Sequence, residues 1–459
     1  MNVAKYFQQN AIKEILMVSI IILGSILFVY VFEKPLSYEK ATMFGGMYFR
    51  VAQNISAHQP IIDESPYVYR LGTPFLVALF FPDDLFLGFK AINLIASVIC
   101  VYLLLFWLRL YLKNSFVRMI LIVLFTTHWL GVLRMTLNNP VHVDAVSLIF
   151  NLLGFIFIFY LRDRKNDLLL IAAFSFTVFI GVFFRESAIF IPFVYVILQA
   201  HDLLRAMPRA KLTRQALLPA VPFVSGLLGV LLTRFLVTPT NPYYLLGTMV
   251  FWFYEKPFPV YVQSYFTTFG PMLAILVSSW GIIRNFLLRE KFNLYYLALI
   301  CFLAWGIGSD TDRFLYWAMP VVYVMFGLAI EYLRPMFCRN WIFPVIILLL
   351  QCLAQRSFLP TPDFAPEKII YRVPILTVIC NDGCSLDIPS YNGITGSGLD
   401  AAMCTPSPCI QNGILFPLQW FLLMEHLLTA GILVYFLLRI KTRFLSPQSL
   451  GTEFQTLQP

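Results

Sequence analysis

The sequence contains few charged residues, and this shortage excludes a soluble fold. Only 12% of the 459 residues are Asp, Glu, Lys or Arg, whereas 59% are hydrophobic, and the mean hydropathy is +0.77. Soluble domains of this total size need far more charge on their surfaces. The composition therefore predicts an integral membrane protein.

Several functional motifs are also absent. The sequence contains no Walker motif, no dinucleotide-binding glycine fingerprint and no HExxH. These absences exclude ATP-driven transport by this chain alone and zinc-protease chemistry. No convincing internal repeat of the sort found in many transporters is present either.

Long apolar runs are what the sequence has in abundance. Runs of roughly 15 to 25 residues are typical of membrane-spanning helices. We expect an all-α polytopic protein with about twelve spans, near residues 14–32, 85–108, 117–133, 140–161, 168–184, 187–200, 216–237, 261–283, 293–309, 313–332, 341–357 and 415–438.

The positions of the basic residues predict the orientation of these spans. Most of the 33 Lys and Arg residues fall in short clusters, which alternate with segments that have few basic residues. Lys and Arg are retained on the cytoplasmic side when short loops insert. The alternation places both termini in the cytoplasm, provided that residues 168–200 cross twice with a turn at Arg185-Glu186. The net charge of +9 is then mostly an orientation signal, and we expect no nucleic-acid partner.

Two segments predicted to be external are unusually long, at residues 33–84 and 358–414. They suggest a transmembrane core over residues 1–335 and a C-terminal part over 336–459. The second segment holds four cysteines that could form disulfides outside the cytoplasm, in any of three pairings, or less favourably a zinc site: Cys380, Cys384, Cys404 and Cys409. We expect a disulfide-stapled external loop.

Four arginines lie on the predicted outer side despite the positive-inside bias, each at the edge of an apolar run: Arg70, Arg134, Arg185 and Arg313. Carboxylates accompany them and could support them: Asp144, Glu186, Asp310 and Asp312. Such groups can simply tie helix ends together, but as a constellation they favour a binding site. His142 would face this site if its helix began later than residue 140.

Arginines beside carboxylates at the outer membrane surface suit a phosphate or pyrophosphate at head-group level, because the guanidinium fork matches such oxyanions. A nearby carboxylate could act as a general base or hold a divalent cation, which would then be a cofactor. Nucleotide sugars are not expected outside the cytoplasm. A lipid-phosphate-linked sugar is therefore the expected donor.

Three short motifs resemble those of the GT-C superfamily of membrane glycosyltransferases: Pro66-Tyr67-Val68-Tyr69-Arg70-Leu71-Gly72-Thr73-Pro74, Phe184-Arg185-Glu186-Ser187 with Pro192, and Asp312-Arg313-Phe314 with Pro320. The resemblance covers about residues 30 to 335. It implies a multi-span inverting transferase that uses polyprenyl-phosphate sugars. It also implies an acid in the first external loop that acts as a base or metal ligand.

The first external loop offers four candidates for this catalytic acid: Glu33, Glu39, Asp63 and Glu64. We favour Glu39, because Glu33 lies beside Lys34 at the predicted helix end, where it could serve only as an anchor.

The expected partners are a lipid-linked sugar donor, membrane lipid, and a cell-envelope glycan or lipid acceptor. The expected location is the bacterial cytoplasmic (inner) membrane. Three alternatives stay open, which are a lipid-linked oligosaccharide flippase or other transporter, a polysaccharide polymerase or ligase, and a non-enzymatic assembly factor.

Overall fold

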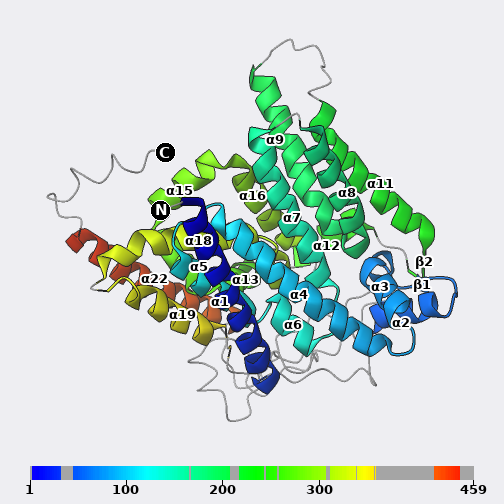
Figure 1. Cartoon of the computed structure of the whole chain (residues 1–459), viewed down its shortest axis with the longest axis horizontal. Helices are drawn as coiled ribbons and strands as arrows, with labels where there is room; N and C mark the ends of the chain where they lie inside the picture. The colour runs from blue at the N-terminus through cyan, green and yellow to red at the C-terminus, as the bar shows by residue number, and fades with distance from the viewer. Residues whose placement is uncertain are drawn as a thin grey trace.

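A computed structural model gives the architecture of the chain (Figure 1). It describes residues 3–32, 45–164, 167–206, 217–241, 244–255, 258–306, 311–337, 339–355, 357 and 418–444. The described part is almost entirely helical, which confirms the predicted all-α class. Its strands are two residues long each, β1 (Ile62–Asp63) and β2 (Thr238–Pro239).

The first half of the chain supplies the helices that surround the site. They are α1 (Val3–Phe32), α2 (Gly45–Ser56), η2 (Tyr67–Tyr69), α3 (Gly72–Phe80), α4 (Leu85–Arg109), α5 (Ser115–Thr127), α6 (Val132–Asn138), α7 (Asp144–Asp163), α8 (Leu168–Phe184), η3 (Glu186–Ile189), α9 (Phe190–Ala206), η4 (Leu218–Ala220) and α11 (Val221–Leu236).

The second half supplies shorter helices and the last long one. They are α12 (Leu245–Glu255), α13 (Phe258–Phe269), α14 (Met272–Ser278), α15 (Trp280–Arg289), α16 (Lys291–Gly306), α17 (Thr311–Tyr316), α18 (Met319–Leu333), η5 (Arg334–Met336), α19 (Ile342–Ala354) and α22 (Leu418–Phe444).

Polar residues set the starts of three long apolar helices. Asp84, Asn114 and Asp167 precede α4, α5 and α8, and each side chain accepts a hydrogen bond from a backbone N–H of the first turn, at 2.9, 3.1 and 3.1 Å. These N-caps satisfy donors that the helix itself leaves unpaired. The helix starts therefore follow from local sequence.

Helices α4, α7, α8 and α11 pack side by side in that order (Figure 1). Glycines permit the close approach of α8 and α11. A Cβ at Gly229 would lie only 3.0 Å from the carbonyl oxygen of Phe179, so a larger residue would force the two helices apart. On the other side of α4, α18 is almost wholly buried, and its Pro320 carbonyl accepts a 2.9 Å hydrogen bond from Trp107 Nε1.

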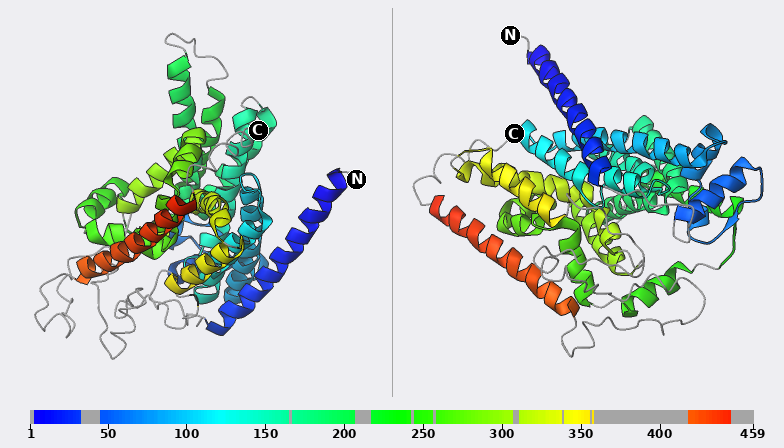
Figure 2. Two further views of the ribbon diagram at one scale, coloured as in Figure 1. Left: turned by 90° about the vertical axis from the view of Figure 1, so that its left-hand side faces the viewer. Right: turned by 90° about the horizontal axis from the view of Figure 1, so that it is seen from below.

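Helix α1 lies at the periphery, where both views of Figure 2 show it along the outside of the other helices. Only 28% of the most apolar segment of this helix is buried inside the structure. One end is fixed by charge, because buried Glu14 accepts from Arg109 Nε at 2.8 Å and from Arg118 Nε at 2.7 Å. Further along, Ser25 and Thr126 share a hydrogen bond of 2.8 Å.

The described part of the predicted first external loop, residues 45–84, is folded. Strands β1 and β2 pair in parallel, with Ile62 opposite Thr238, and this pairing joins the loop to the end of α11. Ser65 reinforces the junction through its backbone N–H, which donates to Asn241 Oδ1 at 2.7 Å. Helices α2 and α3 were not predicted, because they are shorter than a span.

Two predicted spans are broken. The expected 117–133 helix is α5 followed by α6, with a break at His128, whose Nε2 contacts the Thr268 carbonyl at 2.6 Å. The expected 261–283 helix is α13, α14 and α15, and the last two meet at 86°. The expected 140–161 helix begins at Asp144, which leaves His142 in the preceding turn.

Five helical stretches of the described chain are long and apolar enough to cross a membrane: Ile12–Val31, Leu85–Arg109, Ser115–Asn138, Asp144–Asp163 and Leu218–Leu236. The bent pair α14 and α15 would make a sixth. Shorter apolar helices lie at Leu168–Phe184, Glu186–His201, Leu245–Tyr254, Lys291–Gly306, Ile342–Ala354 and Leu427–Ile440. The described structure has a helix within each of the expected ranges, while the count of twelve crossings stays a prediction.

The predicted disulfide staple concerns residues that lie outside the described part: Cys380, Cys384, Cys404 and Cys409. Within the described part, Cys100, Cys301 and Cys352 are free thiols.

Candidate functional site

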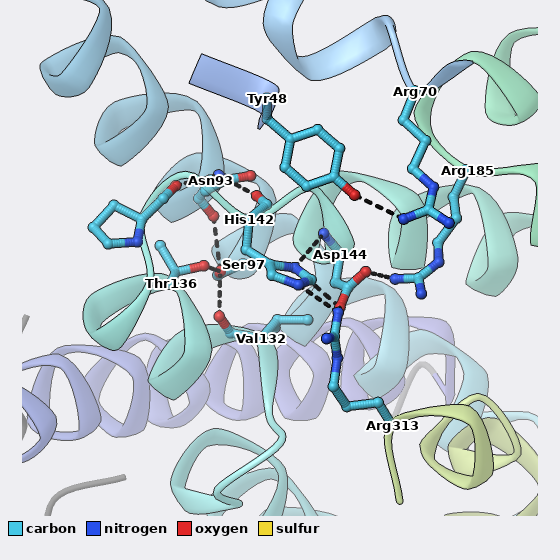
Figure 3. A network of polar contacts seen from close by, with 11 residues as sticks. Tyr48, Arg70, Asn93, Ser97, Val132, Thr136, His142, Asp144, Arg185 and Arg313 are labelled. Carbon is cyan, nitrogen blue, oxygen red and sulfur yellow. Dashed lines mark hydrogen bonds and ion pairs between the residues drawn. The ribbon is translucent and has the colours of Figure 1, made fainter. Parts of the chain in front are cut away.

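Three of the four predicted phosphate-binding arginines meet at one end of the helices (Figure 3). Arg70 follows η2, Arg185 is the C-cap of α8, and Arg313 belongs to the short α17. Asp144, the first residue of α7, lies between Arg185 and Arg313. We call these four residues, together with Glu186, His142 and Tyr48, the arginine cluster.

Asp144 joins two of the arginines. Arg313 Nη2 donates to Asp144 Oδ2 at 2.9 Å, and Arg185 Nη1 forms an ion pair with Asp144 Oδ1. The dipole of α7 also favours a negative charge at this position, because the first turn of a helix carries unpaired N–H groups. One carboxylate thus serves two guanidinium groups that lie in different parts of the sequence.

Arg70 is held by two other partners. Its Nη1 donates to the Tyr48 hydroxyl at 2.7 Å, and its Nε donates to Glu186 Oε2 at 3.1 Å. Its guanidinium also lies over the ring of Tyr67, 5.6 Å from the centroid. Helix α2, which carries Tyr48, therefore connects the folded first loop to the cluster.

His142 fills the space between Tyr48 and Asp144. Burial, followed by the charges of Arg313, Arg185 and Arg70, lowers the pKa of His142 well below its usual value, so the ring is neutral. Arg313 Nη2 contacts Nε2, and because a guanidinium can only donate, Nε2 is the acceptor. The other ring nitrogen, Nδ1, lies 3.0 Å from Asp144 Oδ2 and 3.2 Å from the backbone nitrogen of the same residue.

The turn that carries His142 is fixed by α4. Asn93 Nδ2 donates to the carbonyl of Pro140 at 2.7 Å and to that of His142 at 2.6 Å. Below it, Ser97 Oγ donates to the Asn93 carbonyl and shares a hydrogen bond with Thr136 (Figure 3). These buried contacts hold the start of α7, and with it Asp144, in one position.

Arg185 is the least compensated member of the cluster. Its side chain is 6% exposed, and it shares its carboxylate with Arg313. Burial, followed by the charges of Arg70 and Arg313, lowers the pKa of Arg185 to about 9. Among the described residues its buried Nε finds no hydrogen-bond acceptor, and its guanidinium lies over the ring of Trp317 at 4.7 Å. An additional anion beside Arg185 would compensate its positive charge and accept the hydrogen bond that Nε lacks.

A pocket opens beside the cluster, and its empty space, open solvent included, is about 550 Å³. His142, Asp144 and Arg313 form its polar part. The remaining lining is mostly apolar and comes from Leu130, Val132, Met135, Thr136, Ala145, Ser147, Leu148, Asn151, Tyr316 and Trp317. The arrangement suits a ligand that has an anionic group next to an apolar portion.

Two other predicted residues lie away from the cluster. Arg134 is buried, with Nη1 donating to the Gln355 carbonyl at 3.4 Å. Asp312 accepts from Thr267 Oγ1 at 3.3 Å, although Arg313 next to it joins the cluster.

Of the four candidate acids of the first external loop, the structure describes two. Asp63 is buried and forms a two-point ion pair with Arg50, with Nε to Oδ2 at 2.9 Å and Nη2 to Oδ1 at 2.7 Å. Glu64 follows it and is half-buried. Glu33 and Glu39, as well as Asp310, lie outside the described residues.

The described residues offer no group of three or more His, Cys, Asp or Glu side chains placed to hold a metal ion. Asp144, the central carboxylate, is engaged by two guanidinium groups. These side chains do not fit a divalent cation, and we derive no step through one.

Sequence reasoning did not assign Tyr48 to the site, and it admitted His142 only as a possibility. Tyr48 lies in a short helix of the first loop, and no motif marks it. For His142 a signal was available in the Asn138-Asn139-Pro140 stretch, which is typical of a turn and is compatible with the later helix start that the structure has.

Comparison of the chain with protein-family models, with curated proteins and with solved structures finds no match.

Proposed function

We propose that this protein is a polytopic membrane glycosyltransferase of the GT-C type. It would move a sugar from a lipid-phosphate donor to a cell-envelope glycan or lipid acceptor on the non-cytoplasmic face. The proposal includes about twelve spans, cytoplasmic termini and a bacterial inner-membrane location. It also includes the stapled external loop.

The observation that carries the proposal is Arg185, a buried guanidinium that shares the Asp144 carboxylate and whose Nε has no acceptor among the described residues. Its partner Asp144 lines the cavity, as does Arg313. Arg70 and Arg313 lie close enough for their charges to act on it. Two or three guanidinium forks can hold a phosphate diester or pyrophosphate by paired hydrogen bonds.

The location of the cluster also supports a lipid-linked donor. Asp144 begins one candidate span, and Arg185 ends the apolar helix α8. A phosphate attached to a lipid tail stays at the level where helices leave the apolar core. The cluster can therefore meet the head of such a donor while the apolar lining of the cavity accepts its neighbouring carbons.

In the proposed reaction the acceptor hydroxyl attacks the anomeric carbon and the lipid phosphate departs. Negative charge grows on the leaving phosphate, and Arg185 and Arg313 would stabilise it. Asp144 is engaged by both arginines, which makes it a positioning residue. A separate carboxylate must take the acceptor proton, and Glu39 is the candidate that we favour.

The test is to compare lipid-linked sugars and cell-surface glycans, by mass, in cells with and without the protein. Loss should remove one sugar from a surface glycan or lipid and raise the amount of its lipid-phosphate donor. A variant Arg185→Ala, expressed at the wild-type level, should reproduce the loss. Identical glycan and lipid-linked sugar profiles in the presence and absence of the protein would contradict a transferase.

One observation favours a second candidate, a lipid-linked oligosaccharide flippase. The 86° bend between α14 and α15 is a broken helix of the kind found at transporter binding sites. A flippase would leave the composition of the lipid-linked pool unchanged and alter its distribution between the leaflets. The same mass comparison, combined with an assay of leaflet exposure, separates the two functions.

A further inference from the structure

A second cavity lies at the other end of α7, and its empty space, open solvent included, is about 800 Å³. Its apolar wall includes Trp107, Tyr111, Phe155, Phe159, Leu198 and Phe292. Its polar rim comes from Arg162, Gln199, Arg289, Glu290, Lys291 and Asn293. We call it the distal cavity, and nothing in the proposed transfer reaction uses it.

The distal cavity and the arginine cluster lie at opposite ends of α7. Asp144 begins α7 and Arg162 lies in its last turn, within a helix of 20 residues. At 1.5 Å per residue this helix is about 30 Å long, which is the thickness of the hydrocarbon core. A ligand in the distal cavity therefore comes from the other leaflet or the other aqueous phase.

The apolar wall is rigid. Trp107 packs edge-on against Tyr111 and Phe155, with ring centroids 4.8 and 5.3 Å apart, and its Nε1 is bonded to the carbonyl of Pro320. Phe155 packs in turn against Phe292, at 5.5 Å. Because interlocked rings cannot collapse into the space, the apolar slot is already formed without a ligand.

The rim carries more positive than negative charge. Arg162 Nη1 donates to Glu290 Oε1 at 2.5 Å, so this pair is satisfied internally. Arg289 is exposed and approaches the same carboxylate only to 4.0 Å. Lys291 is exposed too and forms no ion pair with any described residue. The mouth therefore attracts an anion, at the point where α15 ends and α16 begins.

We propose that the distal cavity binds an anionic phospholipid from the leaflet opposite the arginine cluster. Arg289 and Lys291 contact its phosphate, and one acyl chain lies in the slot between Trp107, Phe159 and Leu198. A zwitterionic lipid would lack the net charge that the rim attracts. A soluble phosphate compound would have no group for the apolar slot.

Native mass spectrometry of the full-length protein from mixed micelles tests this proposal, with phosphatidylglycerol and phosphatidylcholine as probes. Wild type should retain phosphatidylglycerol preferentially. The double variant Arg289→Gln, Lys291→Gln should weaken that binding by a factor on the order of ten. The matched control, Arg284→Gln with Arg339→Gln, removes the same charge from exposed positions away from the cavity and should bind as wild type does.

Leu198→Trp tests the acyl slot separately, because it fills the apolar wall and leaves every rim charge in place. This variant should also lose phosphatidylglycerol, and millimolar inorganic phosphate should not displace the lipid from wild type. Unchanged binding in the double variant would overturn the proposal, as would equal retention of phosphatidylcholine. Displacement by inorganic phosphate together with full binding by Leu198→Trp would assign the rim to free phosphate instead. Arg185→Lys should leave the binding of phosphatidylglycerol unchanged. That variant tests the proposed transferase function, whereas the double variant tests phospholipid binding, so either proposal can fail while the other holds.

Discussion

Arg313 lies 169 residues after Asp144 in the chain, and its Nη2 donates to the Asp144 carboxylate over 2.9 Å. Arg185 reaches the other oxygen of the same carboxylate. The contact connects α7, α8 and α17 through a single acidic side chain. Because Arg185 shares this carboxylate and its buried Nε has no acceptor among the described residues, an additional anion beside Arg185 would stabilise the cluster.

The first prediction concerns this shared carboxylate. Asp144→Asn keeps the shape of the side chain but removes the charge that Arg185 and Arg313 share. Asp144 is 26% exposed but Arg185 is buried, so the change leaves a buried guanidinium without its carboxylate. Such a loss costs up to about 3–5 kcal/mol, and the thermal midpoint in detergent should fall clearly. Asp163→Asn, at the exposed opposite end of α7, should change stability by only ~0–1 kcal/mol.

Added pyrophosphate distinguishes an anion-binding site from a purely structural ion pair in the Asp144→Asn variant. Pyrophosphate should restore part of the lost stability, because it can occupy the space between the two arginines. If pyrophosphate has no effect on either protein, the cluster is a structural tie between helices and not an anion site.

The second prediction tests the guanidinium fork. Arg185→Lys and Arg313→Lys preserve one positive charge but present a single ammonium group in place of two parallel donors. Sugar transfer should fall about 100-fold in each, while the amount of inserted protein is unchanged. Arg284→Lys, on the exposed side of α15, should retain normal activity. Full activity in both cluster variants would exclude two-point phosphate binding.

The third prediction follows from His142, which faces Arg70, Arg185, Arg313 and Asp144. Its pKa is lowered in the folded protein, so below about pH 6.5 the unfolded chain takes up a proton that the folded chain does not. Stability therefore decreases as the pH falls from 6.5 toward the folded pKa, by up to ~1.4 kcal/mol per pH unit, and is unaffected by His142 above this range.

The variant His142→Asn lacks this proton uptake. Thermal midpoints measured from pH 8 to pH 5 should therefore fall less steeply in His142→Asn than in wild type. Parallel pH profiles for the two proteins would mean that His142 is protonated in the folded state.

Sequence patterns predicted the helices better than their contacts. Apolar length marked α4, α7 and α8 closely, and the positive-inside bias singled out Arg70, Arg185 and Arg313. No periodicity could reveal that Glu14 pairs with Arg109 and Arg118, about a hundred residues away, or that Tyr48 reaches Arg70. Such pairs depend on tertiary packing, which brings together residues that are far apart in the chain.

The same limit explains Arg134 and the broken spans. By sequence Arg134 resembles the other three arginines at an apolar edge, but α6 turns it toward the Gln355 carbonyl. The breaks at His128 and between α14 and α15 occur within continuous apolar runs, where hydropathy alone shows no interruption. Contacts such as that of His128 with the Thr268 carbonyl decide where these helices end.

The fourth prediction is the orientation of the two faces. Gln59 is exposed in the predicted first external loop, and Asn285 is exposed on α15 at the predicted cytoplasmic side. In intact cells a membrane-impermeant maleimide should label Gln59→Cys above the parent protein, and Asn285→Cys only after permeabilisation. Labelling of Asn285→Cys in intact cells would reverse the topology.

The last prediction concerns the base. Both oxygens of Asp63 accept from Arg50, and Oδ1 also accepts from the backbone N–H of Glu64 at 2.8 Å. A carboxylate whose two oxygens are both engaged by donors of the protein is not free to approach an acceptor hydroxyl. Asp63→Asn should therefore lower stability, through the loss of the contact between α2 and β1, and lower activity only as far as folding is impaired.

Glu39→Gln should behave in the opposite way. Its amide keeps the size of the side chain but cannot take the acceptor proton, so turnover should be abolished while the affinity for the lipid-phosphate donor stays near that of wild type. Donor binding and sugar transfer measured on the same purified sample separate the two effects, and the thermal midpoint should match that of wild type. An active Glu39→Gln protein beside an inactive but stably folded Asp63→Asn or Glu64→Gln protein would move the base to the later pair.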